Sequence, residues 1–184
     1  MAFAVWITGL PGSGKSTIAK ELVKHLKNAE YLRLDEMRKY FIKEPKFNDE
    51  EREFVYSKFI DEGKSIVASG KNVVFDATAH KLKWRNEARS MIRNFIEVNI
   101  KCPLDVCIER ESKRGEGLVL ANLYRKALER KSAGKMFEGL GQVVGIDVPF
   151  EENGNVEIEI ESEKLGPKEA AAAIFNEIKK RGWI

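Results

Sequence analysis

The first residues with an evident chemical purpose lie near the amino terminus, in the stretch WITGLPGSGKST at residues 6–17. It matches the pattern G-x-x-x-x-G-K-[ST], in which glycines let consecutive backbone N–H groups point at phosphate oxygens. We expect Lys15, a predicted catalytic residue, to reach the β- and γ-phosphates of a nucleoside triphosphate, and Ser16 to place its hydroxyl on Mg²⁺. The predicted nucleotide-binding residues are Gly9, Leu10, Pro11, Gly12, Ser13, Gly14, Lys15, Ser16 and Thr17.

Two aspartates, each at the end of an apolar run, are the next candidates for chemistry. Asp35 closes residues 31–35, and Asp76 follows the apolar residues Val73, Val74 and Phe75. If both runs are parallel strands, both carboxylates lie at the edge of the sheet where ligands bind. Asp35 is then expected to take a proton from an attacking hydroxyl or to hold a Mg²⁺-bound water, and Asp76 to be a further Mg²⁺ ligand.

Each of these candidates also has a structural interpretation. Asp35 can cap a following helix, and Asp76 can be a solvated strand end. His80 and Arg85, in the stretch DATAHKLKWR, are placed to contact substrate or phosphate. For His80 alone, an ordinary loop histidine is the simpler interpretation.

The elements that must position these residues alternate along the chain. Apolar runs predict strands at residues 3–8, 31–35, 72–78 and 95–102. Residues 156–161 alternate apolar with acidic side chains and predict a fifth strand, at an edge or half-exposed. Helical patterns lie between and after them, at residues 16–26, 49–69, 84–92, 103–110 and 167–181. This alternation predicts an α/β fold, with a five-stranded, mainly parallel sheet covered by helices on both faces.

Residues 110–147 break the alternation. They are basic and rich in glycine, which favours a mobile lid over a core segment. There are no internal repeats and no low-complexity linker, so we expect residues 1–184 to form a single domain.

Composition narrows the class of protein. The net charge of +3, from 32 basic and 29 acidic residues, does not suggest a nucleic-acid partner. The apolar amino terminus has no basic flank, cleavage site or spanning length, so it predicts a first strand, and neither a signal peptide nor a membrane segment. Cys102 and Cys107 fit reduced thiols in a cytoplasmic protein. Because the base-reading motif N/T-K-x-D of GTPases is absent, the chain suits a kinase for a small-molecule substrate.

The order of motifs resembles that of the adenylyl-sulfate (APS) kinase family. The stretch WITGLPGSGKSTIA is similar to the opening of that family, and LDEMR falls where the family has D-G-D-x-x-R. FNDEER resembles its F-[ST]-x-x-x-R element, and FIEVNIKCPLDVCIERE resembles its fourth strand and following helix. LYRKA and GIDVPFE are similar to its lid and to the stretch beside adenine.

The resemblance implies an activity and further site residues. The family uses ATP and Mg²⁺ to phosphorylate the 3′-hydroxyl of APS, giving PAPS for sulfate assimilation. By resemblance, Asp35 is the catalytic or Mg²⁺-organising aspartate. The substrate residues would be Arg38, Phe47, Arg52 and Arg85, while Arg110 and Lys113 would lie near the base and the phosphates of ATP. The family is commonly dimeric, which makes a homodimer the assembly to test.

Departures from the family pattern fall on the acceptor side and the lid. Arg33 and Leu34 replace the first aspartate and the glycine of D-G-D, and Val55 stands in place of an asparagine. TAHKLKWR replaces S-P-[FY]-R, keeping one of two arginines, and residues 114–122 are extra. Two other hypotheses therefore stay open: a kinase for another hydroxyl acceptor (a nucleoside, another metabolite or an aminoacyl-tRNA), and a nucleotide-binding regulatory module.

Overall fold

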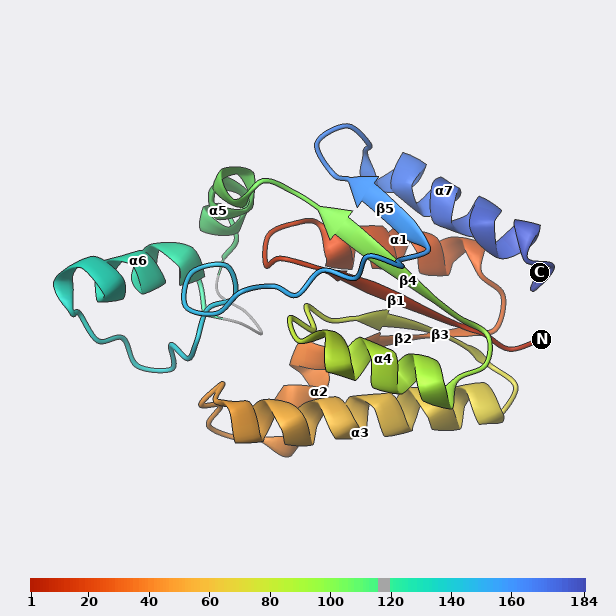
Figure 1. Cartoon of the computed structure of the whole chain (residues 1–184), viewed down its shortest axis with the longest axis horizontal. Helices are drawn as coiled ribbons and strands as arrows, with labels where there is room; N and C mark the ends of the chain where they lie inside the picture. Colours follow the sequence, from red (N-terminus) through yellow and green to blue (C-terminus); the bar gives the residue numbers. More distant parts are fainter. Residues whose placement is uncertain (116–119) are drawn as a thin grey trace.

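Five parallel strands form the centre of the structure, a computed structural model that describes residues 1–115 and 120–184 (Figure 1). The strands are β1 (Ala4–Gly9), β2 (Ala29–Arg33), β3 (Asn72–Asp76), β4 (Phe95–Lys101) and β5 (Ile158–Glu161). Their order in the sheet is β2-β3-β1-β4-β5, and all four pairings are parallel. This confirms the predicted fold class and makes β5 a parallel edge strand.

Seven helices accompany the sheet in the described part of the chain. They are α1 (Lys15–His25), α2 (Leu34–Phe41), α3 (Asp49–Ala68), α4 (Leu82–Met91), α5 (Leu104–Ser112), α6 (Leu123–Ala133) and α7 (Pro167–Lys180). Helices α1 and α7 cover one face, and α2, α3 and α4 cover the other, while α5 and α6 lie beyond the carboxyl ends of the strands (Figure 1). Among the described residues, no helix is both long and apolar enough to cross a membrane.

The two faces of the sheet bury two separate cores. Along β1, every residue is buried, and successive side chains point to opposite faces. Val5 and Ile7 join the core under α1 and α7, whereas Trp6 packs with Phe59 and Phe75 in the core under α3 and α4. Burial on both faces explains why this strand is apolar without alternation.

One predicted boundary needs correction, and it bears on the site. Asp35 does not end a strand: β2 ends at Arg33, and Asp35 lies in the first turn of α2. An acidic residue is favourable there because it faces the positive end of the helix dipole. The segment predicted as a lid contains a regular helix, α6, which packs on α5 through Cys107, Tyr124 and Ala127.

A return segment, residues 148–157, carries the chain from α6 and the loop after it back to β5. Arg85 of α4 anchors this segment by donating to the carbonyl of Glu151. The guanidinium carbon of Arg85 also lies 5.0 Å from the centroid of the Phe150 ring. The backbone N–H of Glu151 donates to the carbonyl of His80 at 2.8 Å. The return segment is therefore fixed to the loop after β3, which lines the site described next.

Candidate active site

The glycine-rich loop between β1 and α1 has the backbone shape that its sequence predicts. Gly9, Gly12 and Gly14 have φ values of 140°, 83° and 99°, which residues with a Cβ rarely adopt. A Cβ on Gly12 would also lie 2.4 Å from the carbonyl oxygen of Cys107. Since α1 begins at Lys15, the loop presents its N–H groups and the positive end of that helix to the same space.

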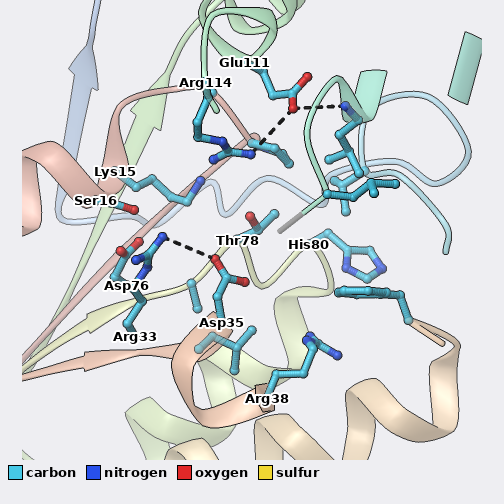
Figure 2. A pocket seen from close by; sticks show the side chains of 18 of the residues that line it. Lys15, Ser16, Arg33, Asp35, Arg38, Asp76, Thr78, His80, Glu111 and Arg114 are labelled. Carbon is cyan, nitrogen blue, oxygen red and sulfur yellow. Dashed lines mark hydrogen bonds and ion pairs between the residues drawn. The ribbon is translucent and has the colours of Figure 1, made fainter. Parts of the chain in front are cut away.

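This space is a cavity of about 460 Å³, bounded by the loop, the carboxyl ends of β2 and β3, and the segment that contains α5 and α6 (Figure 2). Lys15, Ser16, Asp35 and Asp76 line it together. The Lys15 ammonium donates to the carbonyl of Leu10 at 2.8 Å, and the buried Ser13 hydroxyl has no hydrogen-bond partner among residues 1–115 and 120–184. The structure thus brings together the cation, hydroxyl and carboxylates that the sequence singled out.

Burial and charge set the protonation of these groups. Burial lowers the pKa of Lys15, and the negative charges of Asp76 and Asp35 oppose that effect. Burial also raises the pKa of Asp35, and Asp76 raises it further, while Arg33 acts in the opposite direction. The Arg33 guanidinium lies 3.9 Å from the Asp35 carboxylate.

The donor set fits Mg²⁺. This ion is usually held by one or two carboxylates together with substrate phosphates and water, and the site offers two carboxylates and the Ser16 hydroxyl beside the phosphate loop. In the described residues there is no group of three or more His, Cys, Asp or Glu side chains that could hold a metal without a substrate. Asp76 is itself oriented by Tyr31, whose hydroxyl donates to it at 2.7 Å.

The opposite wall of the cavity carries two buried arginines. Arg38 pairs with Glu51 and lies over the ring of Phe47, with its guanidinium carbon 4.7 Å from the ring centroid. Arg52 donates to the backbone carbonyl of Gln142 at 2.6 Å, and lies 3.4 Å from Nε2 of His80. All five side chains come from α2, α3 and two loops that the folded sheet brings to one side.

His80 is held as an uncharged ring. Burial lowers its pKa to about 4, and the neighbouring charge of Arg52 contributes in the same direction. Its ring packs edge-on against Trp84, with centroids 5.2 Å apart. A neutral ring accepts the hydrogen bond from Arg52, so His80 is more than a solvated loop residue.

Most of the predicted site residues line the cavity. The exceptions are Gly9, Leu10 and Ser13 of the phosphate loop, together with Lys113 and Arg85. Arg110 lines the cavity while donating to the Ser162 hydroxyl at 2.9 Å. Lys113 is exposed and paired with Glu109 at 2.6 Å. Arg85 is fully buried outside the cavity, in an ion pair with Glu97 at 2.5 Å. For Arg85 the expected substrate contact is therefore replaced by a structural one.

Several residues at the cavity were not anticipated. Arg114 and Glu111 line it from the end of α5, and Gln142 lines it from the glycine-rich loop after α6. Tyr124 of α6 donates to the carbonyl of Pro11 at 2.8 Å and so contacts the phosphate loop itself. Nothing in the spacing of Arg114 or Gln142 distinguishes it from the other polar residues of that segment.

The parallel sheet, the phosphate loop after its central strand, the paired carboxylates and the cover over the cavity define a P-loop kinase. Comparison with protein families then places the chain more narrowly, because the model of the adenylylsulphate kinase family matches residues 1–161. The chain belongs to the adenylylsulphate kinase family, whose members are ATP-dependent kinases.

Individual relatives agree with this assignment. A probable adenylyl-sulfate kinase of Archaeoglobus fulgidus is 30% identical over 168 residues, which cover 89% of this chain and 98% of the relative. An adenylyl-sulfate kinase of Thermodesulfovibrio yellowstonii is 32% identical over 186 residues, covering 98% and 85%. Among solved structures, the Mycobacterium tuberculosis APS kinase in complex with AMPPNP and APS has the same fold, with a TM-score of 0.76, 24% identity and coverage of 97% and 98%.

Proposed function

We propose that the protein transfers the γ-phosphate of ATP to the 3′-hydroxyl of adenylyl sulfate, giving PAPS and ADP, with Mg²⁺ as cofactor. The family assignment supports both the reaction and the cofactor. Among the structural observations, the surroundings of Arg52 best distinguish between possible acceptors, because they favour an acceptor with a negative charge.

Arg52 is 5% exposed, yet in the described part of the chain no carboxylate lies within ion-pair distance of its guanidinium. Its partners are the carbonyl and amide oxygen of Gln142 and the neutral ring of His80. A buried charge without a counter-ion is costly, so this position favours an anionic ligand. The phosphosulfate group of APS is such an anion, whereas a neutral nucleoside is not.

The other residues have roles that follow from where they lie. The phosphate loop and Lys15 hold the phosphates of ATP, while Arg38, Phe47 and Arg52 hold the acceptor on the opposite wall, where the Phe47 ring can stack on a base. Asp35, between the two walls, accepts the proton of the attacking hydroxyl. Ser16, Asp35 and Asp76 would hold Mg²⁺, which neutralises the charge that develops on the transferred phosphoryl group.

The direct test mixes purified protein with ATP, MgCl₂ and APS and follows PAPS and ADP separately. We expect equal amounts of both products. Replacing Lys15 with alanine is expected to abolish turnover while the circular dichroism spectrum stays unchanged. Near-normal turnover in Lys15→Ala would contradict the assignment of the phosphate loop.

A panel of acceptors distinguishes the proposed substrate from its alternatives. Adenosine, adenosine monophosphate and aminoacyl-tRNA are each added in place of APS, and ADP release is measured. We expect release above the background with APS alone. If adenosine supports release and APS does not, the argument from Arg52 is wrong.

We also propose an arrangement for the whole chain. Residues 1–184 act as one kinase domain in which residues 110–147 are the lid, since α5 and α6 form their own small core over the cavity. The free thiols of Cys102 and Cys107 support a cytoplasmic location, and the family resemblance supports a homodimer. Light scattering of the eluting protein measures its mass, and a monomer mass would exclude the dimer.

A further inference from the structure

Two adjacent cations at the end of α5 point in different directions. Lys113, the C-cap residue, is exposed and paired with Glu109 on the surface of the same helix. Arg114, the next residue, lines the cavity, and its guanidinium is directed toward Lys15 (Figure 2). By the family resemblance, Arg114 is the first of the extra residues 114–122, whereas Lys113 has a counterpart in the family pattern.

Glu111 holds Arg114 in place. This carboxylate is 1% exposed and accepts the backbone N–H of Leu123 at 3.0 Å and that of Tyr124 at 3.5 Å, at the start of α6. Asn122, the N-cap residue of α6, makes no side-chain cap, so Glu111 replaces that cap from another helix. Arg114 lies 3.7 Å from the same carboxylate. One buried group therefore fixes both the lid helix and the arginine.

Arg114 and Lys15 face the same space with like charges. In the described residues, the only ion pair of Arg114 is the 3.7 Å contact with Glu111, which already accepts two backbone hydrogen bonds. Burial is the main cause of the lowered pKa of Lys15, and the positive charge of Arg114 acts in the same direction. Two cations across a cavity favour an anion between them, and Lys15 is the residue that reaches the β- and γ-phosphates.

We propose that Arg114 is a catalytic residue that contacts the γ-phosphate of ATP and stabilises the charge it develops during transfer. Arg114 thus has the role near the phosphates of ATP that the family resemblance implies for Lys113. This inference rests on the proposed kinase function, but not on the identity of the acceptor. The guanidinium forms hydrogen bonds to phosphoryl oxygens, the bond from the γ-phosphorus to the bridging oxygen breaks, and the acceptor oxygen forms the new bond.

Steady-state kinetics of Arg114→Ala test the catalytic contact. We expect kcat to fall at least about 100-fold with a smaller change in the KM of the acceptor, because an arginine that contacts the transferred phosphoryl group acts mainly in the transition state. Free guanidinium added to the assay is expected to restore part of the lost activity. Lys113→Ala tests the rival residue. The proposal is overturned if Lys113→Ala loses activity and Arg114→Ala does not.

Arg125→Ala is the matched control, since Arg125 is an exposed lid arginine paired only with Glu129 at 3.7 Å among the described contacts. We expect its kcat to match that of the unmodified protein. Thermal melting curves of all variants check the fold. A loss in Arg114→Ala that accompanies a large drop in melting temperature and resists guanidinium would indicate a structural role and overturn the proposal.

Calorimetry with nucleotide alone separates this inference from the proposed acceptor. With Mg²⁺ present, Arg114→Ala is expected to bind AMPPNP about tenfold more weakly and ADP with nearly unchanged affinity, because only the former carries a γ-phosphoryl group. This difference persists even if APS proves not to be the acceptor. Equal losses for AMPPNP and ADP would show that Arg114 does not contact the γ-phosphate.

Discussion

Asp35 illustrates how single residues in this site combine two roles. Its carboxyl is close enough to Asp76 and buried enough for its pKa to be raised, yet Arg33, Lys15 and Arg38 moderate the increase. A carboxylate with a raised pKa binds a proton more readily than a solvated one. In the proposed reaction, this environment makes Asp35 a better acceptor for the proton of the attacking hydroxyl.

The pH dependence of turnover should reveal this role. Because the pKa of Asp35 is raised above 3.8, its base form is lost as the pH falls, at a higher pH than for an ordinary aspartate. We expect kcat/KM to fall on the acidic side and Asp35→Asn to lower kcat by about 10²–10⁴-fold. An acidic limb that is unchanged in Asp35→Asn would show that another group accepts the proton.

His80 leads to a separate prediction about stability. Its pKa falls from 6.5 in the unfolded chain to about 4 in the folded one, so the unfolded state binds more protons between these values. The stability that the neutral ring contributes is therefore complete above pH 6.5 and is lost as the pH falls toward 4. We expect His80→Gln to remove about 1–3 kcal/mol of this pH dependence, measured by urea unfolding at pH 7 and pH 4.5. Identical pH dependence of stability in His80→Gln and in the unmodified protein would show that the pKa of His80 is not lowered by folding.

At the scale of elements, the buried Arg85–Glu97 pair connects α4, β4 and the return segment. Arg85 also binds the carbonyl of Glu151, and Asn153 donates to Glu97 at 2.7 Å. The loop after β3, which is bonded to Glu151 through His80, is therefore held in position by contacts that lie outside the cavity. This network explains why Arg85 is fully buried although the family resemblance implied a substrate contact.

Breaking this pair should destabilise the fold strongly. Glu97→Gln leaves the Arg85 guanidinium buried without a counter-charge, and we expect a loss of about 3–5 kcal/mol in the free energy of unfolding. Adding Arg85→Met should recover part of that loss. Glu30→Gln, which removes an exposed pair with Lys71, is expected to cost less than about 1 kcal/mol. Similar losses in Glu97→Gln and Glu30→Gln would contradict the structural role.

The sequence predicted the elements better than the boundaries and contacts at the site. Four strands were predicted because apolar runs are typical of strands in a parallel sheet, and β5 was predicted because its run alternates apolar and acidic residues. The boundary between β2 and α2 was missed, because Arg33 and Leu34 suit either element locally. Arg114, Glu111 and Gln142 could not be identified, since their positions depend on how α5 and α6 pack over the cavity and not on a local pattern.

At the scale of the whole molecule, α5 and α6 form a cover over the cavity that contacts the phosphate loop through a small number of residues. Tyr124 binds the carbonyl of Pro11, and Cys107 packs against Gly12. The apolar cluster around α5 and α6 shares no buried residue with the two cores of the sheet. We therefore expect that the proposed lid can open for product release without disturbing either core.

Nucleotide should therefore protect the cover from proteolysis. We expect trypsin to cleave within residues 110–147 first, and AMPPNP with Mg²⁺ to slow this cleavage severalfold, because a bound triphosphate connects the loop with the cover. Tyr124→Phe should speed the cleavage in the absence of nucleotide. Cleavage that begins in α3 instead, or that nucleotide does not alter, would argue against a lid.

The strand order has a consequence for how the chain reaches its folded state. The phosphate loop is synthesised first, but β1 lies between β3 and β4 and has no partner before residue 72 has been made. Helix α1, which follows the loop, packs against α7 at the opposite end of the chain. Because such distant contacts form slowly, the earliest synthesised part of the catalytic machinery should be among the last to acquire its final shape.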